Sequence, residues 1–308
     1  MTSRNDLLDA ARGVLILLVV WGHFLEIDGF GGDLYFAIYT FHIPAFVMIS
    51  GMFATQTISR DGFKKLVWRL FVPLVCFQLL YFLTLDHYAP KRVTEIYHPA
   101  WIMWFLYSLL PWKLLLPLVV RLPFPVILSV GVALLAGYSD KIGGGMSLSR
   151  TIVFFPAFLI GHLYGARVLQ IANRYRGLLA CVFVVTFAVA FIWVAPDVQI
   201  RWLWGADPYS ELEAVAPGFV YRAIAIGVGI GMAVALFAIV PRRSSGLAYL
   251  GRRTLPIYLM HGFAIIALWP LKPVVVEDVE FYALTFVLTL ALSFAIALAR
   301  DVLFRAQR

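Results

Sequence analysis

Long apolar stretches alternate with short polar segments along the whole chain. A helix that crosses a bilayer needs about 20 mainly apolar residues, and ten stretches come close to this length. They lie at residues 7–26, 34–54, 65–85, 100–120, 122–138, 150–167, 177–195, 215–240, 254–270 and 281–304. Several prolines crowd the junction between the fourth and fifth stretches, so merging them into nine spans is the alternative. The pattern predicts an all-α, polytopic integral membrane helical bundle of about ten transmembrane helices.

The composition agrees with a membrane protein. Of 308 residues, 62% are hydrophobic and 14% are charged, whereas soluble domains are about half apolar and a quarter charged. Ten crossings leave about 100 residues for loops, too few for a separate soluble domain. We therefore expect one transmembrane domain over residues 1–308. The first apolar stretch continues through Trp21 and His23 without a small-residue cleavage site, so we expect a retained helix rather than a signal peptide.

The charged residues segregate between alternate loops. If the N-terminus is cytoplasmic, 17 of the 25 Lys and Arg residues fall on the cytoplasmic side, together with 4 of the 17 acidic residues. Because Lys and Arg in short loops favour the cytoplasm, we expect both termini there. In a bacterial host the membrane would be the inner one. The net charge of +8 then reflects topology, and we expect no nucleic-acid partner, since that function needs a basic patch on a folded surface.

Motifs for metals and nucleotides are missing from the sequence. Cys76 and Cys181 lie alone in apolar stretches, so neither a disulfide framework nor a metal site is predicted. The glycines at 143–145 are not followed by Lys-Ser or Lys-Thr, and no dinucleotide-binding glycine loop occurs. The two halves of the chain show no repeat, which disfavours transporters built from duplicated halves.

The first stretch, LLDAARGVLILLVVWGHFLE, carries two polar groups on one helix face. Arg12 and His23 are eleven residues apart, which is three turns plus about 20°, and about 16 Å along the axis. Asp9 and Glu26 each lie three residues from one of them, so each can form an ion pair within the helix. A carboxylate beside His23 would fix its tautomer and raise its basicity, as a general base requires. The structural alternatives are a snorkelling Arg12 and an interhelical hydrogen bond at His23.

These residues match a known family signature. Arg12 and His23, preceded by Asp9, fit the R-x10-H signature in the first helix of the membrane acyltransferase 3 family. Further matching segments are FHIPAFVMISGMFA at 41–54, KKLVWRLFVPL at 64–74, WIMWFLYSLL at 101–110, FFPAFLIGHLYG at 154–165 and LGRRTLPIYLMHGFAI at 250–265. The chain resembles this family over nearly its whole length. The sequences of these motifs are similar to those of the fucose 4-O-acetylase-like branch. It departs from the family at the second basic motif, which is not an all-Arg cluster.

The resemblance implies an integral membrane O-acyltransferase. Such an enzyme moves an acetyl group from cytoplasmic acetyl-CoA, its acyl donor, to a hydroxyl of a carbohydrate or glycolipid acceptor on the extracytoplasmic side. His23 and Glu26 would act as the general base, and Arg12 would bind donor phosphate or polarise the thioester. No hydrolase-like domain is appended to the sequence, so we expect the membrane domain to complete the transfer alone. Direct transfer and an acyl-histidine intermediate both stay open.

Further polar residues are candidates for binding the two substrates. Lys64, Lys65 and Arg69 begin the third stretch and would bind coenzyme A phosphates, although positive-inside topology also places basic residues there. The candidates for acceptor binding are His42, Trp104, Arg222 and His261. Their structural alternatives are a hydrogen bond between helices for His42, ordinary packing for His261, a buried ion pair for the arginine and an interfacial aromatic belt for the tryptophan.

Two other function classes stay open. A secondary transporter or exporter of an anionic or acylated small molecule would use buried His23, Arg222 and Lys113. A polytopic scaffold would have no turnover. Dependence on coenzyme A separates the enzyme from both. The sequence selects neither the acceptor, nor acetyl over other acyl groups, nor the oligomeric state, so a homo-oligomer stays open.

Overall fold

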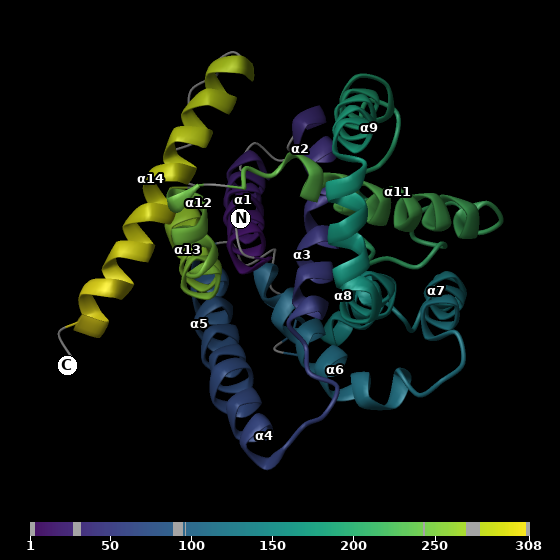
Figure 1. The fold of residues 1–308 in the computed structure, drawn as a ribbon, viewed down its shortest axis with the longest axis horizontal. Coiled ribbons are helices and arrows are strands. Elements are labelled where there is room, and N and C mark those ends of the chain that lie inside the picture. The colour runs from purple at the N-terminus through teal and green to yellow at the C-terminus, as the bar shows by residue number, and fades with distance from the viewer. Residues whose placement is uncertain are drawn as a thin grey trace. The chain divides into compact units, whose positions relative to one another are not determined.

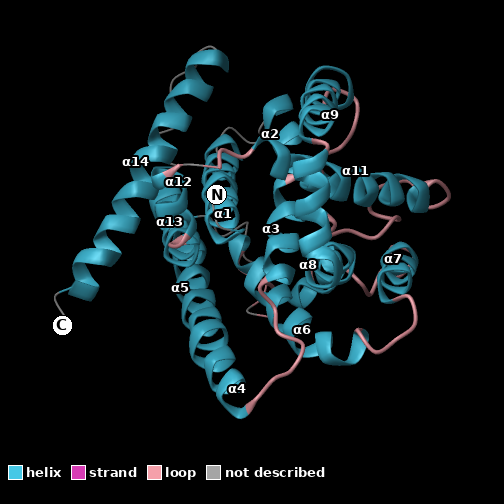
Figure 2. Ribbon diagram, in the orientation of Figure 1, coloured by secondary structure: helices cyan, strands magenta, loops and turns pink. Residues whose placement is uncertain are grey.

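The computed structural model describes residues 4–26, 32–88, 95, 97–242, 244–268 and 278–305. These residues form helices and connecting loops, and no strand occurs among them (Figure 2). Within this part of the chain, eight helical segments have the length and composition to cross a membrane, and two shorter apolar helices span Pro125–Ala136 and Thr254–Leu268. The predicted all-α polytopic bundle is thus confirmed, while the total of ten crossings stays a prediction. The chain ends lie outside the described residues, so their cytoplasmic placement also stays a prediction.

The helices group into two compact units. The expectation of one transmembrane domain over residues 1–308 stays a prediction. Unit 1 comprises Met1–His42, Ala172–Asp197 and Val234–Arg308. Its elements are α1 (Arg4–Leu25), α2 (Gly32–Tyr39), α9 (Arg176–Val189), η6 (Ala190–Val194), α12 (Ser245–Gly251), α13 (Thr254–Leu268) and α14 (Asp278–Arg305). Helix α1 contacts α2, α12, α13 and α14, and α14 runs along α13 (Figure 1). The helix with the family signature is therefore enclosed by partners from distant parts of the chain.

Two glycines let the backbones of α1 and α12 touch. A Cβ added at Gly13 would lie 2.0 Å from the Leu247 carbonyl oxygen, and one at Gly251 would lie 1.7 Å from the Asp9 carbonyl oxygen. Only glycine fits at either place, because real Cβ atoms do not approach backbone this closely. Ser244 caps the start of α12 by accepting a hydrogen bond from the Leu247 amide at 3.3 Å. The hydropathy pattern did not predict this short helix.

The second predicted stretch, 34–54, is interrupted rather than continuous. Helix α2 ends at Tyr39 and α3 (His42–Met52) begins after two residues. The Thr40 hydroxyl donates a 2.7 Å hydrogen bond to the Ala37 carbonyl at this turn. His42 consequently stands at the start of a helix, two residues before Pro44, a position where a proline is tolerated.

Unit 2 comprises Ile43–Ile171 and Val198–Ala233. Its further elements are α4 (Arg60–Leu66), η2 (Val67–Phe71), α5 (Val72–Tyr88), η4 (Trp101–Met103), α6 (Trp104–Val119), α7 (Pro125–Ala136), η5 (Gly145–Ser147), α8 (Leu148–Arg174), α10 (Arg201–Trp204) and α11 (Gly218–Ile239). Trp112 and Phe158 pack together at the centre of its core, with ring centroids 5.6 Å apart. Unit 2 thus has a hydrophobic core of its own.

The proline-rich junction separates two helices. Helix α6 ends at Val119, and Phe124 adopts a left-handed φ of 51° immediately before α7. Pro125 is the first residue of α7, where its missing N–H has no helical partner to lose. Pro111 and Pro117 lie inside α6. The fourth and fifth stretches therefore form separate helices.

Large apolar side chains also cover the outside of the protein. Trp68 on η2 and Leu135 on α7 are each 70% exposed, and Val184 on α9 and Leu298 on α14 are also exposed. A soluble protein rarely exposes this much apolar surface, whereas the hydrocarbon core of a bilayer accepts it. The length of the helices and their apolar exteriors together identify an integral, multi-pass membrane protein.

Candidate active site

Arg12 lies in a cluster of charges where α1, α12 and α13 meet. Its Nη2 donates a 3.1 Å hydrogen bond to the Thr254 hydroxyl, and its Nη1 lies 3.5 Å from Asp9 Oδ1. Arg252 Nη1 lies 3.5 Å from the other carboxylate oxygen of Asp9. Two guanidinium groups therefore share one carboxylate, which leaves the cluster with a net positive charge. Arg12 keeps 27% of its side chain exposed, so an anion can still reach it.

His23 and Glu26 form the pair that their spacing predicts. His23 Nδ1 lies 3.1 Å from Glu26 Oε2, and His23 is 9% exposed. A carboxylate oxygen only accepts hydrogen bonds, so Nδ1 carries the proton and donates it. In the neutral ring the lone pair then resides on Nε2. This is the tautomer that a general base needs, because Nε2 can accept a proton from a substrate.

Two more imidazoles lie near His23. The ring centroid of His261, on α13, is 5.4 Å from that of His23. A charge on His23 would interact electrostatically with both His261 and His42. His261 Nδ1 lies 3.0 Å from the Ile257 carbonyl, and His42 Nδ1 lies 2.9 Å from the Ile38 carbonyl. Three histidines from separate parts of the sequence thus gather in unit 1, and two of them are held by backbone carbonyls.

The structure also brings two tyrosines to this place, which the sequence reasoning missed. The rings of Tyr35 and Tyr39 on α2 are 4.1 Å apart, and that of Tyr39 is 4.4 Å from His42. A Cβ at Gly22 would lie 3.2 Å from Tyr39 Cε2, so the glycine before His23 allows this close packing. The four-residue spacing of Tyr35 and Tyr39 was a signal for the contact between their rings, whereas the turn that brings His42 beside Tyr39 was not visible in the sequence. Among the described residues, no three His, Cys, Asp or Glu side chains are arranged to hold a metal ion.

Trp104 belongs to unit 2, where it packs against a cation. The Arg150 guanidinium carbon lies 4.9 Å from the centroid of its ring. Arg150 Nε donates a 3.2 Å hydrogen bond to the Trp204 carbonyl. These contacts link α6, α8 and α10, and the role of Trp104 in acceptor binding stays a prediction.

Arg222 is buried in unit 2 against backbone carbonyls. Its Nη2 donates to the Asp207 carbonyl at 2.6 Å, its Nη1 to the Ala133 carbonyl at 3.3 Å, and its Cζ lies 4.6 Å from the Tyr209 ring centroid. Burial raises the pKa of the Tyr209 phenol, which therefore stays protonated and donates a 2.8 Å hydrogen bond to the Leu134 carbonyl. Arg222 fixes the loop before α11 on the end of α7. A role in substrate binding stays a prediction.

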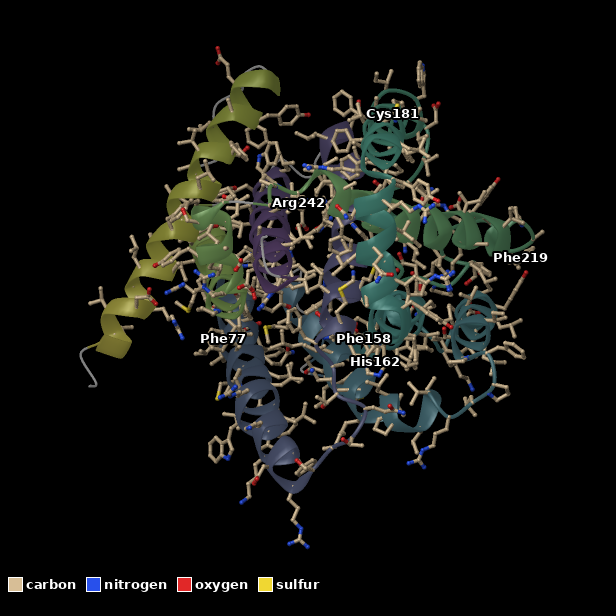
Figure 3. The ribbon with its side chains drawn as sticks, viewed as in Figure 1. Phe77, Phe158, His162, Cys181, Phe219 and Arg242 are labelled. Carbon is tan, nitrogen blue, oxygen red and sulfur yellow. The ribbon has the colours of Figure 1, made fainter. Side chains whose placement is uncertain are left out.

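The remaining basic candidates are exposed residues of unit 2. Lys64 and Lys65 lie on α4 and Arg69 lies on η2. Elsewhere in this unit, His162 is half-buried on α8, one helical turn from the core residue Phe158 (Figure 3). It provides a histidine outside the imidazole cluster for comparison.

Comparisons with known proteins agree with the resemblance. The family model described as an acyltransferase domain, that of the acyltransferase 3 family, matches residues 5–298. The nodulation protein NolL of Sinorhizobium fredii is 43% identical over 72 residues, which are 21% of this chain and 20% of that protein. The NolL of Mesorhizobium japonicum is 40% identical over 72 residues, 21% and 19% of the two chains.

The aligned segment spans only about a fifth of the length of these relatives. No solved structure is significantly similar. The family model, in contrast, covers nearly the whole sequence. The chain therefore belongs to the membrane acyltransferase 3 family of acyltransferases.

Proposed function

We propose that this protein moves an acetyl group from cytoplasmic acetyl-CoA to a hydroxyl of a carbohydrate or glycolipid acceptor on the extracytoplasmic side. The observation that carries the proposal is the partly buried His23–Glu26 pair at 3.1 Å, at the end of the helix that also carries Arg12. Both Arg12 and His23 contact α13, at Thr254 and His261. The helix thus carries a cation and a base on one face, at two different depths along its axis.

His23 acts as the general base in the proposed reaction. A hydroxyl is a weak nucleophile, so His23 Nε2 takes its proton as the oxygen attacks the thioester carbonyl. Glu26 stabilises the imidazolium that forms, through the hydrogen bond to Nδ1. The carbon–sulfur bond then breaks, and His23 returns the proton to the leaving thiolate. One ester bond forms, one thioester bond is lost, and the base is regenerated.

The Arg12 cluster supports binding of the donor phosphates. Guanidinium groups bind phosphate by two parallel hydrogen bonds. Arg12 is partly exposed and Arg252 is more so, and Asp9 holds the two close together. The cluster keeps a net positive charge after Asp9 is counted, so it fits an anionic group. For Lys64, Lys65 and Arg69 of unit 2, binding of coenzyme A phosphates stays the prediction made from the sequence.

The imidazole and tyrosine cluster supports a polyhydroxylated acceptor. Histidine nitrogens accept hydrogen bonds from hydroxyl groups, and aromatic rings pack against the apolar faces of small ligands in pockets. His42, His261 and Tyr39 supply both kinds of contact beside His23. A carbohydrate combines hydroxyl groups with an apolar ring face, and it therefore suits this set of residues.

The proposal is tested with the purified full-length protein in lipid nanodiscs. Labelled acetyl-CoA is incubated with a panel of glycans, and ester-linked label in the glycan is measured. We expect transfer by the wild type and a raised KM for acetyl-CoA in the Arg12→Ala variant. The Lys113→Ala variant is the matched control, because it also removes a basic side chain from an apolar helix. It should keep the KM of the wild type for acetyl-CoA.

Two results would favour the rival functions. A transporter in sealed vesicles would move its solute without any thioester donor. A scaffold would give no labelled product with any glycan. Either result, obtained with protein that elutes as a folded species, would contradict the proposed enzyme.

A further inference from the structure

The joint between α12 and α13 carries three consecutive residues that bind different helices. Arg252 and Arg253 form the joint, and Thr254 begins α13. Arg252 and Thr254 both contact charged residues of α1, in the cluster described above. Arg253 lies between them in the chain and contacts Asp301 of α14 instead. The segment that supplies two contacts of the Arg12 cluster is therefore tied to a second helix (Figure 1).

The contact between Arg253 and Asp301 is an ion pair with two hydrogen bonds. Arg253 Nε donates a 2.9 Å hydrogen bond to Asp301 Oδ1, and its Nη2 donates to Oδ2. The two side chains are 15% and 20% exposed, so ions in the solvent screen this pair less than a pair at the surface. Two parallel hydrogen bonds fix the plane of a guanidinium as well as its distance. The pair therefore determines how Arg253 is oriented.

Tyr249 of α12 joins the same contact. Its hydroxyl donates a 3.1 Å hydrogen bond to the Asp301 carboxylate, and the Arg253 Cζ lies 3.8 Å from the centroid of its ring. Arg253 Nη1 donates a 3.1 Å hydrogen bond to the Tyr249 carbonyl, in the last turn of α12, where carbonyls lose their helical partners. The ring of Tyr249 also lies nearly parallel to that of Phe294 on α14. Arg253 thus ties the end of α12 to α14 through several atoms.

The two adjacent arginines differ in what they leave open to a ligand. Arg253 is paired with Asp301 and only 15% exposed, so an anion reaches it poorly. Arg252 is 52% exposed and shares the Asp9 carboxylate with Arg12. Arg252 therefore faces an incoming anion, whereas Arg253 anchors the joint.

We propose that Arg253 is a positioning residue for the acyl donor. Its ion pair with Asp301 fixes the joint, and the joint holds Arg252 and Thr254 against α1. This inference rests on the proposed function, because that proposal assigns the Arg12 cluster to the donor phosphates. Arg253 does not touch the donor, and it acts through its two neighbours in the chain.

Loss of the ion pair should weaken donor binding and leave the chemical step intact. A joint that rotates displaces Arg252 and Thr254 together, and a misplacement of about 1 Å can cost about 100-fold. For a smaller displacement in Arg253→Gln we expect the Kd and the KM for acetyl-CoA to rise by about 10-fold. The kcat should stay within about twofold, because lost uniform binding raises KM alone. His23 lies at the other end of α1.

The test uses the full-length protein in lipid nanodiscs. Binding of labelled acetyl-CoA, KM and kcat are measured for the wild type, Arg253→Gln, Asp301→Asn and the double variant. Both single changes break one contact, so the double variant should raise Kd no more than either single variant. Arg253→Lys keeps the charge without the two parallel hydrogen bonds, and its Kd should be intermediate.

Two controls separate positioning from stability. Arg300 lies 3.1 Å from the same carboxylate but is 43% exposed, and exposed ion pairs contribute little, so Arg300→Gln should keep the Kd of the wild type. Trp112→Phe removes a hydrogen bond in the core of unit 2. This variant should lose stability and also keep the Kd of the wild type.

The outcomes separate the inference from the proposed function. If the wild type binds acetyl-CoA and folded Arg253→Gln binds it equally well, the inference is wrong and the proposed function stands. An additive rise of Kd in the double variant, or an equal rise in Trp112→Phe, would also overturn the inference. If Arg253→Gln does not fold, Arg253→Lys and Asp301→Asn decide by the same criteria. A wild type that neither binds acetyl-CoA nor transfers its acetyl group would refute the proposed function, and the inference with it.

Discussion

The contact between α1 and α12 gives a sharp test of how packing supports the donor site. Replacing Gly251 by Ala puts a methyl group 1.7 Å from the Asp9 carbonyl oxygen. Backbone occupies that position, so no flexible side chain can move aside. Helix α12 must shift away from α1, and Arg252 and Thr254 must move with it.

The size of the effect can be worked out from this distance. Real Cβ atoms stay about 3 Å or more from such an oxygen, so the helix must move by more than ~1 Å. Overpacking of this kind costs about 1–3 kcal/mol, while Ala in place of Gly favours a helix by up to ~1 kcal/mol. A 1 Å misplacement of binding residues can lower activity about 100-fold. We therefore expect a net loss of stability of about 1–2 kcal/mol and a raised KM for acetyl-CoA.

The matched control is Gly246→Ala on the same helix. The nearest atom to its added methyl group is Phe294 Cζ at 3.8 Å, an ordinary contact. The assay is unfolding of both variants in mixed micelles, followed by tryptophan fluorescence, together with KM for acetyl-CoA. Equal stability and equal KM for Gly251→Ala and Gly246→Ala would refute the packing described for α1 and α12.

Three further predictions follow from single contacts. Glu26→Gln should lower kcat by about 10- to 100-fold, because a charged hydrogen bond to His23 is worth about 1.5–3 kcal/mol; an unchanged kcat would contradict its role. Trp112→Phe should destabilise by about 1–3 kcal/mol, since the indole donates a 2.7 Å hydrogen bond to the buried Thr151 carbonyl, whereas Trp68→Phe at an exposed site should be nearly neutral in unfolding experiments. In a cysteine-free background, Ser245→Cys should react with an impermeant thiol reagent from the cytoplasm and Ser139→Cys from the opposite side, and reversed labelling would overturn the topology.

The helices themselves were predictable because both lipid and the protein core select apolar residues. Hydropathy located every long helix, but it did not resolve the break between α2 and α3, where Thr40 and Phe41 continue the apolar run. It also passed over α12, which is too short and too close to arginines to stand out. Both features matter for the site. The break between α2 and α3 positions His42, and α12 positions Arg252, which directly follows it.

The part of the candidate site that lies along the first helix could be predicted from the sequence. The spacing of Arg12, His23 and Glu26 follows from helix geometry alone, and the structure contains the His23–Glu26 pair. Thr254 lies 242 residues from Arg12 in sequence, so only the packing of α13 on α1 brings them together. For the same reason the contact between the rings of His23 and His261 was invisible in the sequence, although both residues were candidates. The partners of Arg222 could not be predicted either. They are backbone carbonyls, and the pattern of side chains along the sequence does not reveal such contacts.

The most direct test of the account is acetyl transfer by the His23→Ala variant. The purified wild type, His23→Ala and His162→Ala are each incubated with labelled acetyl-CoA and an accepted glycan, and ester formation is followed over time. The account predicts that His162→Ala transfers label as the wild type does, and that His23→Ala, folded and still able to bind acetyl-CoA, loses at least about 100-fold in kcat. Full transfer by a folded His23→Ala protein would contradict the assignment of His23 as the base.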